Sequence, residues 1–233
     1  MLLEQLREGA HETKTLFSKE IFYRLEREIG HRFFRREPPE RGSPRLLNLG
    51  AGPLYYKDWI NADDFAFKRS IRERAFSPDW RLDITRPWKC RNDFWDGIFS
   101  QHVIEHVSYA DAVHVLEECH RTMKPGAWLR VSVPDARIFA AGYLQQAPSI
   151  AGYAFLKPAL ALSFLTQMHY HKSTWDADLM CALLEEIGFE SVREVVFGAG
   201  SDPRLVMDQD AKREESLYVE ARKVGAASEP SIS

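Results

Sequence analysis

The chain has 233 residues, of which 45% are hydrophobic and 28% are charged, and its formal net charge is -3 at pH 7. This length and apolar content suit the core of one α/β domain with additional segments. The slight excess of acid argues against a protein that mainly grips nucleic acid, because phosphate binding calls for an excess of Lys and Arg.

The cysteines and apolar segments bear on the cellular compartment. Cys90, Cys119 and Cys181 lie far apart without a C-x-x-C pair, so they predict neither a disulfide framework nor a thiolate metal site. The N-terminal sequence lacks the uninterrupted apolar core of a signal peptide, and a Lys-Pro pair interrupts the apolar stretch at 151–165. We therefore expect a cytoplasmic protein with no integral membrane segment.

Residues 1–43 predict a helical extension followed by a Pro-rich linker. Phe17, Ile21, Leu25 and Ile29 line one helical face, and Lys and Arg occupy much of the rest. Such a basic amphipathic helix either packs on the domain with a solvated outer face or contacts an acidic partner or an anionic membrane surface. The prolines that follow end the helix and mark a domain boundary.

From residue 44 to residue 224, predicted strands and helices alternate, which favours a mostly parallel sheet flanked by helices and closed by an antiparallel C-terminal hairpin. We expect a helical insertion over 136–174, a mobile connector between the last two strands and a disordered tail at 225–233. The expected strands are 46–49, 59–63, 80–83, 96–100, 128–133, 192–197 and 216–221. One expected helix begins at the capping box of Ser108 and stops at Pro125-Gly126, and another ends at Gly188.

The first strand runs into a loop of Gly50, Ala51 and Gly52. Glycine permits backbone dihedrals that other residues avoid, and it lets a ligand lie against the main chain. A dinucleotide fingerprint needs a third glycine three residues later, whereas here Pro53 follows, so the sequence gives little support to an NAD site. The alternative is an ordinary tight turn between elements.

Polar residues also follow the later strands, namely Asp63, Asp83 and the segment Ser100 to His106. The carboxyl ends of parallel strands are where open α/β sheets bind ligands. With this pattern the sequence resembles the class I S-adenosylmethionine-dependent methyltransferases, in particular a small subgroup with an H-x-x-E-H motif after strand four that is often found near polysaccharide biosynthesis. The resemblance covers about 44–135 well, and later segments moderately.

The resemblance implies a Rossmann-like doubly wound fold and S-adenosylmethionine as cofactor, with S-adenosylhomocysteine as product and a small-molecule, glycan or lipid-linked acceptor. Asp63 would accept hydrogen bonds from the ribose, with adjacent Asp64 as a rival and a helix cap as the alternative role. The glycine loop and Asn48, which stands where many relatives have an acid, would lie under the methionine part of the cofactor. Further implied cofactor contacts are Asp83 and Ile84 at the adenine, and Ser100 and Gln101 near the sulfonium. The alternative for Asp83 is an exposed aspartate in a turn.

Methyl transfer depends mainly on alignment of the reactants, and a base contributes only where the acceptor must lose a proton. His102 and His171 are the candidate bases, because the first follows strand four and the second lies in a segment that closes over the site in relatives. We expect His106 to hydrogen-bond beneath the following helix instead. Aromatic residues of the insertion either shape the acceptor pocket or only pack; they are Tyr153, His169 and Tyr170.

Two other classes of function use the same residues. The motif from His102 to His106 matches inverted zinc peptidases, whose chemistry needs two imidazoles on one helical face, a third ligand and a glutamate base. That interpretation leaves the glycine loop, Asp63 and Asp83 unexplained, so we expect no metal site. A cofactor-binding domain that has lost its chemistry and serves as an interaction module is the other alternative, suggested by the helical extension and by Asn48.

Overall fold

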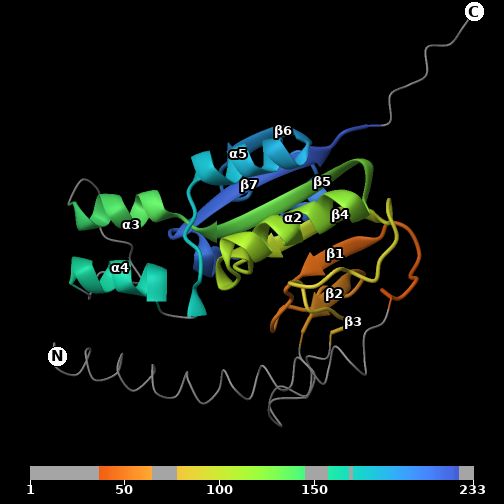
Figure 1. Cartoon of the computed structure of the whole chain (residues 1–233), viewed down its shortest axis with the longest axis horizontal. Coiled ribbons are helices and arrows are strands. Elements are labelled where there is room, and N and C mark those ends of the chain that lie inside the picture. The colour runs from red at the N-terminus through yellow and green to blue at the C-terminus, as the bar shows by residue number, and fades with distance from the viewer. Residues whose placement is uncertain (1–36, 65–77, 145–156, 168–169, 226–233) are drawn as a thin grey trace, which may run out of the picture.

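A computed structural model describes residues 37–64, 78–144, 157–167 and 170–225. Seven strands form one sheet in the order β3-β2-β1-β4-β5-β7-β6 (Figure 1). Strands β1 to β5 run parallel, and β7 pairs antiparallel with both β5 and β6. The predicted mostly parallel sheet with an antiparallel C-terminal hairpin is confirmed. The predicted N-terminal helix and C-terminal tail lie outside the described residues.

The strands are β1 Leu46–Leu49, β2 Ile60–Asp63, β3 Trp80–Arg81, β4 Trp95–Gln101, β5 Met123–Pro134, β6 Phe189–Val195 and β7 Ser216–Lys223. The α-helices are α2 Tyr109–Thr122, α3 Ala136–Tyr143, α4 Pro158–Gln167 and α5 Ala177–Ile187, and the short 3-10 helices are η1 Ile104–His106, η4 Pro203–Leu205 and η5 Asp210–Lys212. Within these residues no helix combines the length and the apolar character needed to cross a membrane.

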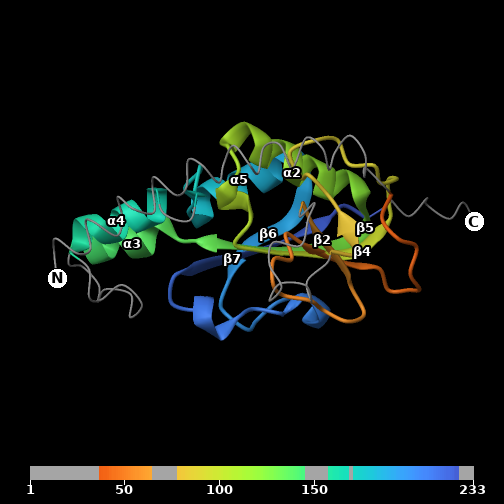
Figure 2. The same cartoon turned by 90° about the horizontal axis from the view of Figure 1, so that it is seen from below.

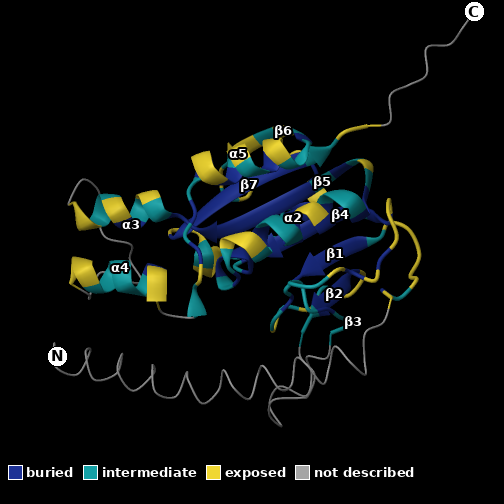
Figure 3. Cartoon of the chain, viewed as in Figure 1, coloured by how far each residue is buried: buried dark blue, intermediate teal, exposed yellow. Residues whose placement is uncertain are grey.

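The sheet is covered differently on its two faces. Helices α2 and α5 pack on one face, and the connector between β6 and β7, with η4 and η5, covers the other (Figure 2). Figure 3 shows the central strands as the most buried layer, with exposed residues on the outer sides of the helices. Helices α3 and α4 lie side by side beyond the carboxyl end of β5.

Strand β1 has all four residues buried and pairs in parallel with β2 on one side and β4 on the other. The order of the sheet reverses between β1 and β4, because the chain continues outward to β2 and β3 and later returns to form β4 and β5. In open α/β sheets such a switch point creates a crevice at the carboxyl ends of the strands. The register pairs Leu49 with Ala62 and with Ser100, which brings three strand ends together.

Most helix boundaries follow the predicted signals. The Ser108 hydroxyl accepts a hydrogen bond from the Asp111 amide at the start of α2, and Gly188 ends α5 with a left-handed backbone at φ 107°. The prediction that α2 continues to Pro125 was wrong. The chain enters β5 at Met123 because that residue pairs with Trp95 at the start of β4.

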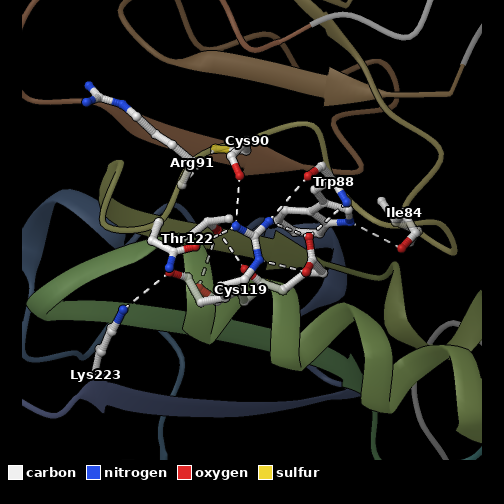
Figure 4. Close-up of polar contacts among 10 residues, drawn as sticks. Ile84, Trp88, Cys90, Arg91, Cys119, Thr122 and Lys223 are labelled. Carbon is white, nitrogen blue, oxygen red and sulfur yellow. Dashed lines mark hydrogen bonds and ion pairs between the residues drawn. The ribbon is translucent and has the colours of Figure 1, made fainter.

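The loop between β3 and β4 is held against α2 by an ion pair on that helix (Figure 4). Arg121 pairs with Glu118 at 2.7 Å and donates to the Cys90 carbonyl at 2.8 Å, while Glu118 accepts from the Trp88 amide at 2.8 Å. The Trp88 indole in turn donates to the carbonyl of Ile84. The ion pair between Arg121 and Glu118 therefore holds the segment that follows β3 against α2.

The connector between β6 and β7 is not the loosely attached loop that its polar composition predicted. Leu205 is buried against the sheet, and Asp208 makes a two-pronged ion pair with Arg130 of β5 at 2.7 and 2.5 Å. The two side chains are only 2% and 1% exposed. The ion pair thus holds in place the part of the connector that carries Lys212 and Glu215 and leads into β7.

Replacing Asp208 with Ala should lower the free energy of unfolding by about 3–5 kcal/mol, because it leaves the Arg130 guanidinium buried without its counter-charge. Asp210→Ala is the matched control in the same connector, since the side chain of Asp210 is 87% exposed and exposed ion pairs contribute about 0–1 kcal/mol. Urea titrations of both variants make the comparison. Equal losses in the two would contradict a dominant role for the buried pair.

The glycine loop packs tightly against the segment that follows β4. Gly50 has a left-handed backbone at φ 68°, and a Cβ placed on it would lie 2.3 Å from Cγ2 of Val103. Gly52 is also left-handed at φ 51°, but a Cβ there would meet no atom within 4 Å. The two glycines are therefore required for different reasons, Gly50 for both space and dihedral and Gly52 for its dihedral alone.

Gly50→Ala should lower the free energy of unfolding by about 2–5 kcal/mol, from left-handed strain together with overpacking. Gly52→Ala should cost only about 1–2 kcal/mol, because the strain acts alone. Adding Val103→Ala to Gly50→Ala should recover part of the loss, which a double-mutant cycle of urea titrations measures. Indistinguishable effects of the two glycine variants would argue against the packing account.

Candidate functional site

The structure brings the predicted loop residues and Asp63 together at the switch point. The Gly52 amide donates to Oδ2 of Asp63 at 2.7 Å, and the Asp64 amide donates to Oδ1 at 2.8 Å. The Ala51 amide donates to the carbonyl of Ala62. The Asp63 carboxylate is therefore anchored to the loop while it lies, half-buried, at the carboxyl end of β2.

Asn48 lies beneath this loop and is buried, with 2% of its surface exposed. Its amide nitrogen donates to the Leu54 carbonyl at 2.9 Å and to Oδ1 of Asn61 at 3.0 Å. Asn61 continues the network to Tyr56 and Asp79. The amide of Asn48 thus supports the loop from below.

Asp83 follows β3 and closes a local turn. One carboxylate oxygen accepts from the amide and the hydroxyl of Thr85, at 3.1 and 2.7 Å, and the other lies 3.2 Å from Nε of Arg86. The side chain is 7% exposed, in contrast to the exposed turn aspartate considered from the sequence. The Ile84 carbonyl accepts a hydrogen bond from the Trp88 indole, which holds Ile84 in place.

Buried polar atoms without partners gather at the ends of β4 and β5. Among the described residues, the hydroxyls of Ser100 and Ser132 and both amide atoms of Gln101 have no hydrogen-bond partner. Gln101 and Ser132 pair directly in the sheet. Because buried polar groups are nearly always satisfied, such a group of atoms is typical of a surface that a ligand or water completes. Ser132 was not anticipated, since a strand-five serine carries no motif of its own.

The segment after β4 is held in a strained conformation. His102 has a left-handed backbone at φ 53°, and its amide donates to the Ser132 carbonyl. Its ring places Nε2 2.7 Å from the Ser216 hydroxyl and Nδ1 3.2 Å from Oε1 of Glu105. Left-handed residues other than glycine concentrate at functional sites, where neighbouring contacts enforce them.

Glu105 is the buried centre of this segment, and its side chain is 2% exposed. No described residue makes a hydrogen bond of good geometry to either carboxylate oxygen. Burial alone would raise the pKa of Glu105, but the neighbouring imidazoles, first His102 at 3.2 Å and then His106, outweigh burial and lower that pKa. The sequence motif contained Glu105, yet its burial could not be predicted from spacing.

Three histidines surround that carboxylate. Nε2 of His106 lies 3.8 Å from Oε1 of Glu105, and Nε2 of His171 lies 4.0 Å from the same oxygen. His171 arrives there because the carbonyl of Glu105 accepts from the amides of Lys172 and Ser173 at 2.7 and 3.2 Å. The predicted pair His102 and His171 is thus brought together, although the sequence gave His106 a role beneath the helix instead.

These histidines line a cavity of about 380 Å³ between the end of β5 and the insertion. Tyr170 also lines it, whereas Tyr153 and His169 lie outside the described residues. The rest of the wall combines apolar with charged side chains, and most of them were not predicted from the sequence. These side chains are Phe139, Phe164, Leu165, Lys212 and Glu215. A concave site with an apolar wall and a few convergent polar groups is typical of small-molecule binding.

All three cysteines are free thiols away from this arrangement. Cys90 and Cys119 are buried, and burial raises the pKa of Cys90 to about 12 and raises that of Cys119 further. The thiols therefore stay protonated and take no part in the polar chemistry of the site.

Comparisons with known proteins agree with this architecture. A family model described as a methyltransferase domain matches residues 17–194. No curated protein matches the sequence. A crystal structure of an S-adenosylmethionine-dependent methyltransferase from Archaeoglobus fulgidus is similar in fold, with a TM-score of 0.50 and 15% identity over 90% of this chain and 99% of that chain.

A second such methyltransferase structure, from Mesorhizobium loti, has a TM-score of 0.49 and 20% identity over 79% of this chain and 93% of that chain. The family match spans the glycine loop, all five parallel strands and the H-x-x-E-H segment. It therefore covers the elements that build the candidate site, apart from Lys212, Glu215 and Ser216. The chain belongs to the methyltransferase domain family.

Proposed function

We propose that this protein transfers a methyl group from S-adenosylmethionine to a small-molecule, glycan or lipid-linked acceptor. The observation that carries the proposal is the family match across parallel strands whose carboxyl ends lie at one edge of the sheet. The glycan and lipid-linked acceptors are suggested by the sequence resemblance, and the cavity volume is compatible with part of such a molecule.

The residues present fit an adenosyl cofactor. Gly52 leaves open space where a side chain would stand, so a ligand could approach the main chain there. Asp63 would accept from the ribose hydroxyls, with Asp83 and Ile84 beside the adenine. Ser100 and Gln101 offer unsatisfied polar atoms for the remaining contacts. When bound, the cofactor supplies a methyl group on a positively charged sulfur.

The chain's own task is then to hold the acceptor, exclude water and remove a proton where the acceptor carries one. Positioning alone can contribute roughly 7–11 kcal/mol toward the barrier. His102 and His171 both face the cavity and are the proposed proton acceptors. The apolar residues of α3 and α4 would shield the reaction from solvent.

The direct test is a mass spectrum of the small molecule that copurifies with the full chain, followed by a screen of sugars and lipid-linked intermediates with labelled S-adenosylmethionine. Retained adenosyl compound with label transferred to an acceptor is the expected result. Retained cofactor with no transfer across the screen would instead favour the interaction-module alternative. An absence of cofactor binding would overturn the proposal.

Asp63→Ala should weaken S-adenosylhomocysteine binding about 10- to 100-fold, because hydrogen bonds to a charged group contribute about 1.5–3 kcal/mol. Asp63→Asn keeps one oxygen for the Gly52 amide and should weaken binding less. Asp64→Ala tests whether the adjacent aspartate binds the ribose instead, and Asp58→Ala, at an exposed position, is the control. Isothermal titration calorimetry gives the affinities. An unchanged affinity in Asp63→Ala would refute the ribose assignment.

His102→Ala should lower kcat by about 10²- to 10⁴-fold, the usual contribution of a general base. His102→Asn removes the base as well, but asparagine tolerates the left-handed backbone, so it separates chemistry from strain. Both variants should keep S-adenosylhomocysteine affinity within about twofold. A parallel loss of turnover and cofactor affinity would mean that His102 is a binding residue.

A further inference from the structure

We infer that Glu105, His106 and His171 form a binding site for one divalent transition-metal ion of the zinc type in the wall of the cavity. Their ligand atoms all lie within 4.8 Å of one another, and they come from two segments that are far apart in the sequence. This inference departs from the expectation of no metal site.

The carboxylate of Glu105 is the first observation that points to a cation. Its side chain is 2% exposed, Nδ1 of His102 lies 3.2 Å from Oε1, and no described residue makes a hydrogen bond of good geometry to either oxygen. An ionised carboxylate in such a place is costly unless a positive charge accompanies it. A metal ion would supply that charge and would occupy the unsatisfied oxygens directly.

The tautomer of His171 fits the same role. Its Nδ1 lies 2.7 Å from the carbonyl of Leu165, and because a carbonyl only accepts, Nδ1 carries the proton. In the neutral ring Nε2 then has a lone pair, and that atom is the one 4.0 Å from Glu105. A metal ion placed between Nε2 of His171 and the Glu105 carboxylate would bind both through their lone pairs. A backbone carbonyl on the other nitrogen is also the usual way in which proteins orient a metal-binding histidine.

The spacing of the donors is close to that of a coordinated ion. Ligands bound tetrahedrally at about 2.0–2.2 Å from zinc lie roughly 3.4 Å from one another. The distances of 3.8 and 4.0 Å from Glu105 exceed this by a few tenths of an ångström, which small side-chain rotations can close. Imidazole nitrogens favour zinc, copper, iron and nickel over magnesium, which prefers oxygen ligands.

Three protein ligands leave at least one coordination position, and the cavity lies in front of it. If the proposed methyl transfer holds, that position would bind an acceptor hydroxyl and lower its pKa. The hydroxyl O–H bond would break, its proton would pass to a ring nitrogen of His102, and the oxygen would remain on the metal. His171 would then be a ligand and His102 the base.

The test uses the untagged full chain, stripped with a chelator and titrated with zinc chloride by calorimetry, with cobalt chloride added in a parallel sample to read the visible spectrum. One ion per chain should bind, and cobalt should show the absorption of a nitrogen- and oxygen-ligated ion. Glu105→Gln, His106→Ala and His171→Ala should each weaken zinc at least tenfold. His114→Ala on α2, outside the cluster, should not.

Glu105→Gln is the decisive variant because it changes one atom and leaves the carbonyl that receives Lys172 and Ser173 in place. Far-ultraviolet circular dichroism of every sample shows that each variant is folded, and S-adenosylhomocysteine binding is measured beside it. Zinc that fails to bind, or that binds equally well to all four variants, overturns the metal site while leaving the proposed function intact. Zinc that binds as expected to a chain without affinity for S-adenosylhomocysteine overturns the proposed function instead.

Discussion

The parallel pairing of β1 with β4 is the constraint on which both parts of the candidate site depend. Leu49 lies opposite Ser100, so the glycine loop and the histidine segment leave the sheet at the same level. A slip of one residue would turn every side chain of β1 to the opposite face, and it would remove the Asn48 amide from its hydrogen bonds to Leu54 and Asn61. The contact between Val103 and Gly50 then joins the two segments directly. The loop and the histidine cluster are therefore parts of one packed unit.

The sequence was most informative where local chemistry decides the structure. The apolar run that forms β1, the alternation of β7, the capping serine of α2 and the terminal glycine of α5 each act within a few residues. Alternation of these elements was enough to predict the parallel sheet, and the carboxyl-end rule then gathered Gly52, Asp63 and Ser100 at one edge. The family resemblance added roles to positions that the pattern had already grouped.

Long-range partners could not be predicted in the same way. Arg130 and Asp208 are 78 residues apart, and the polar composition of the connector resembles a solvated loop unless the buried guanidinium is known. The end of α2 was also misplaced, because the pairing of Met123 with β4 outweighs the stop signal of Pro125. In both cases a tertiary interaction overrides what the local sequence favours.

The H-x-x-E-H motif shows the same limit at the site itself. The peptidase interpretation assumed that both imidazoles lie on one helical face, but His102 is left-handed and precedes a helix of only three residues. The histidine that instead joins His106 at the carboxylate is His171, delivered by hydrogen bonds to the carbonyl of Glu105. The motif therefore grouped Glu105 and His106 correctly. It indicated His102 as the second imidazole beside them, whereas the structure places His171 there.

Asn48 was the residue that suggested lost chemistry, because an acid often stands at its place in similar sequences. Its surroundings give a different reason for the amide. The nitrogen of Asn48 donates to two oxygens, on Leu54 and Asn61, in a buried position. An ionised carboxylate has no proton to donate and would face both oxygens with a negative charge, at a cost of at least the two hydrogen bonds. Asparagine is therefore what this loop requires, and its presence does not indicate an inactive site.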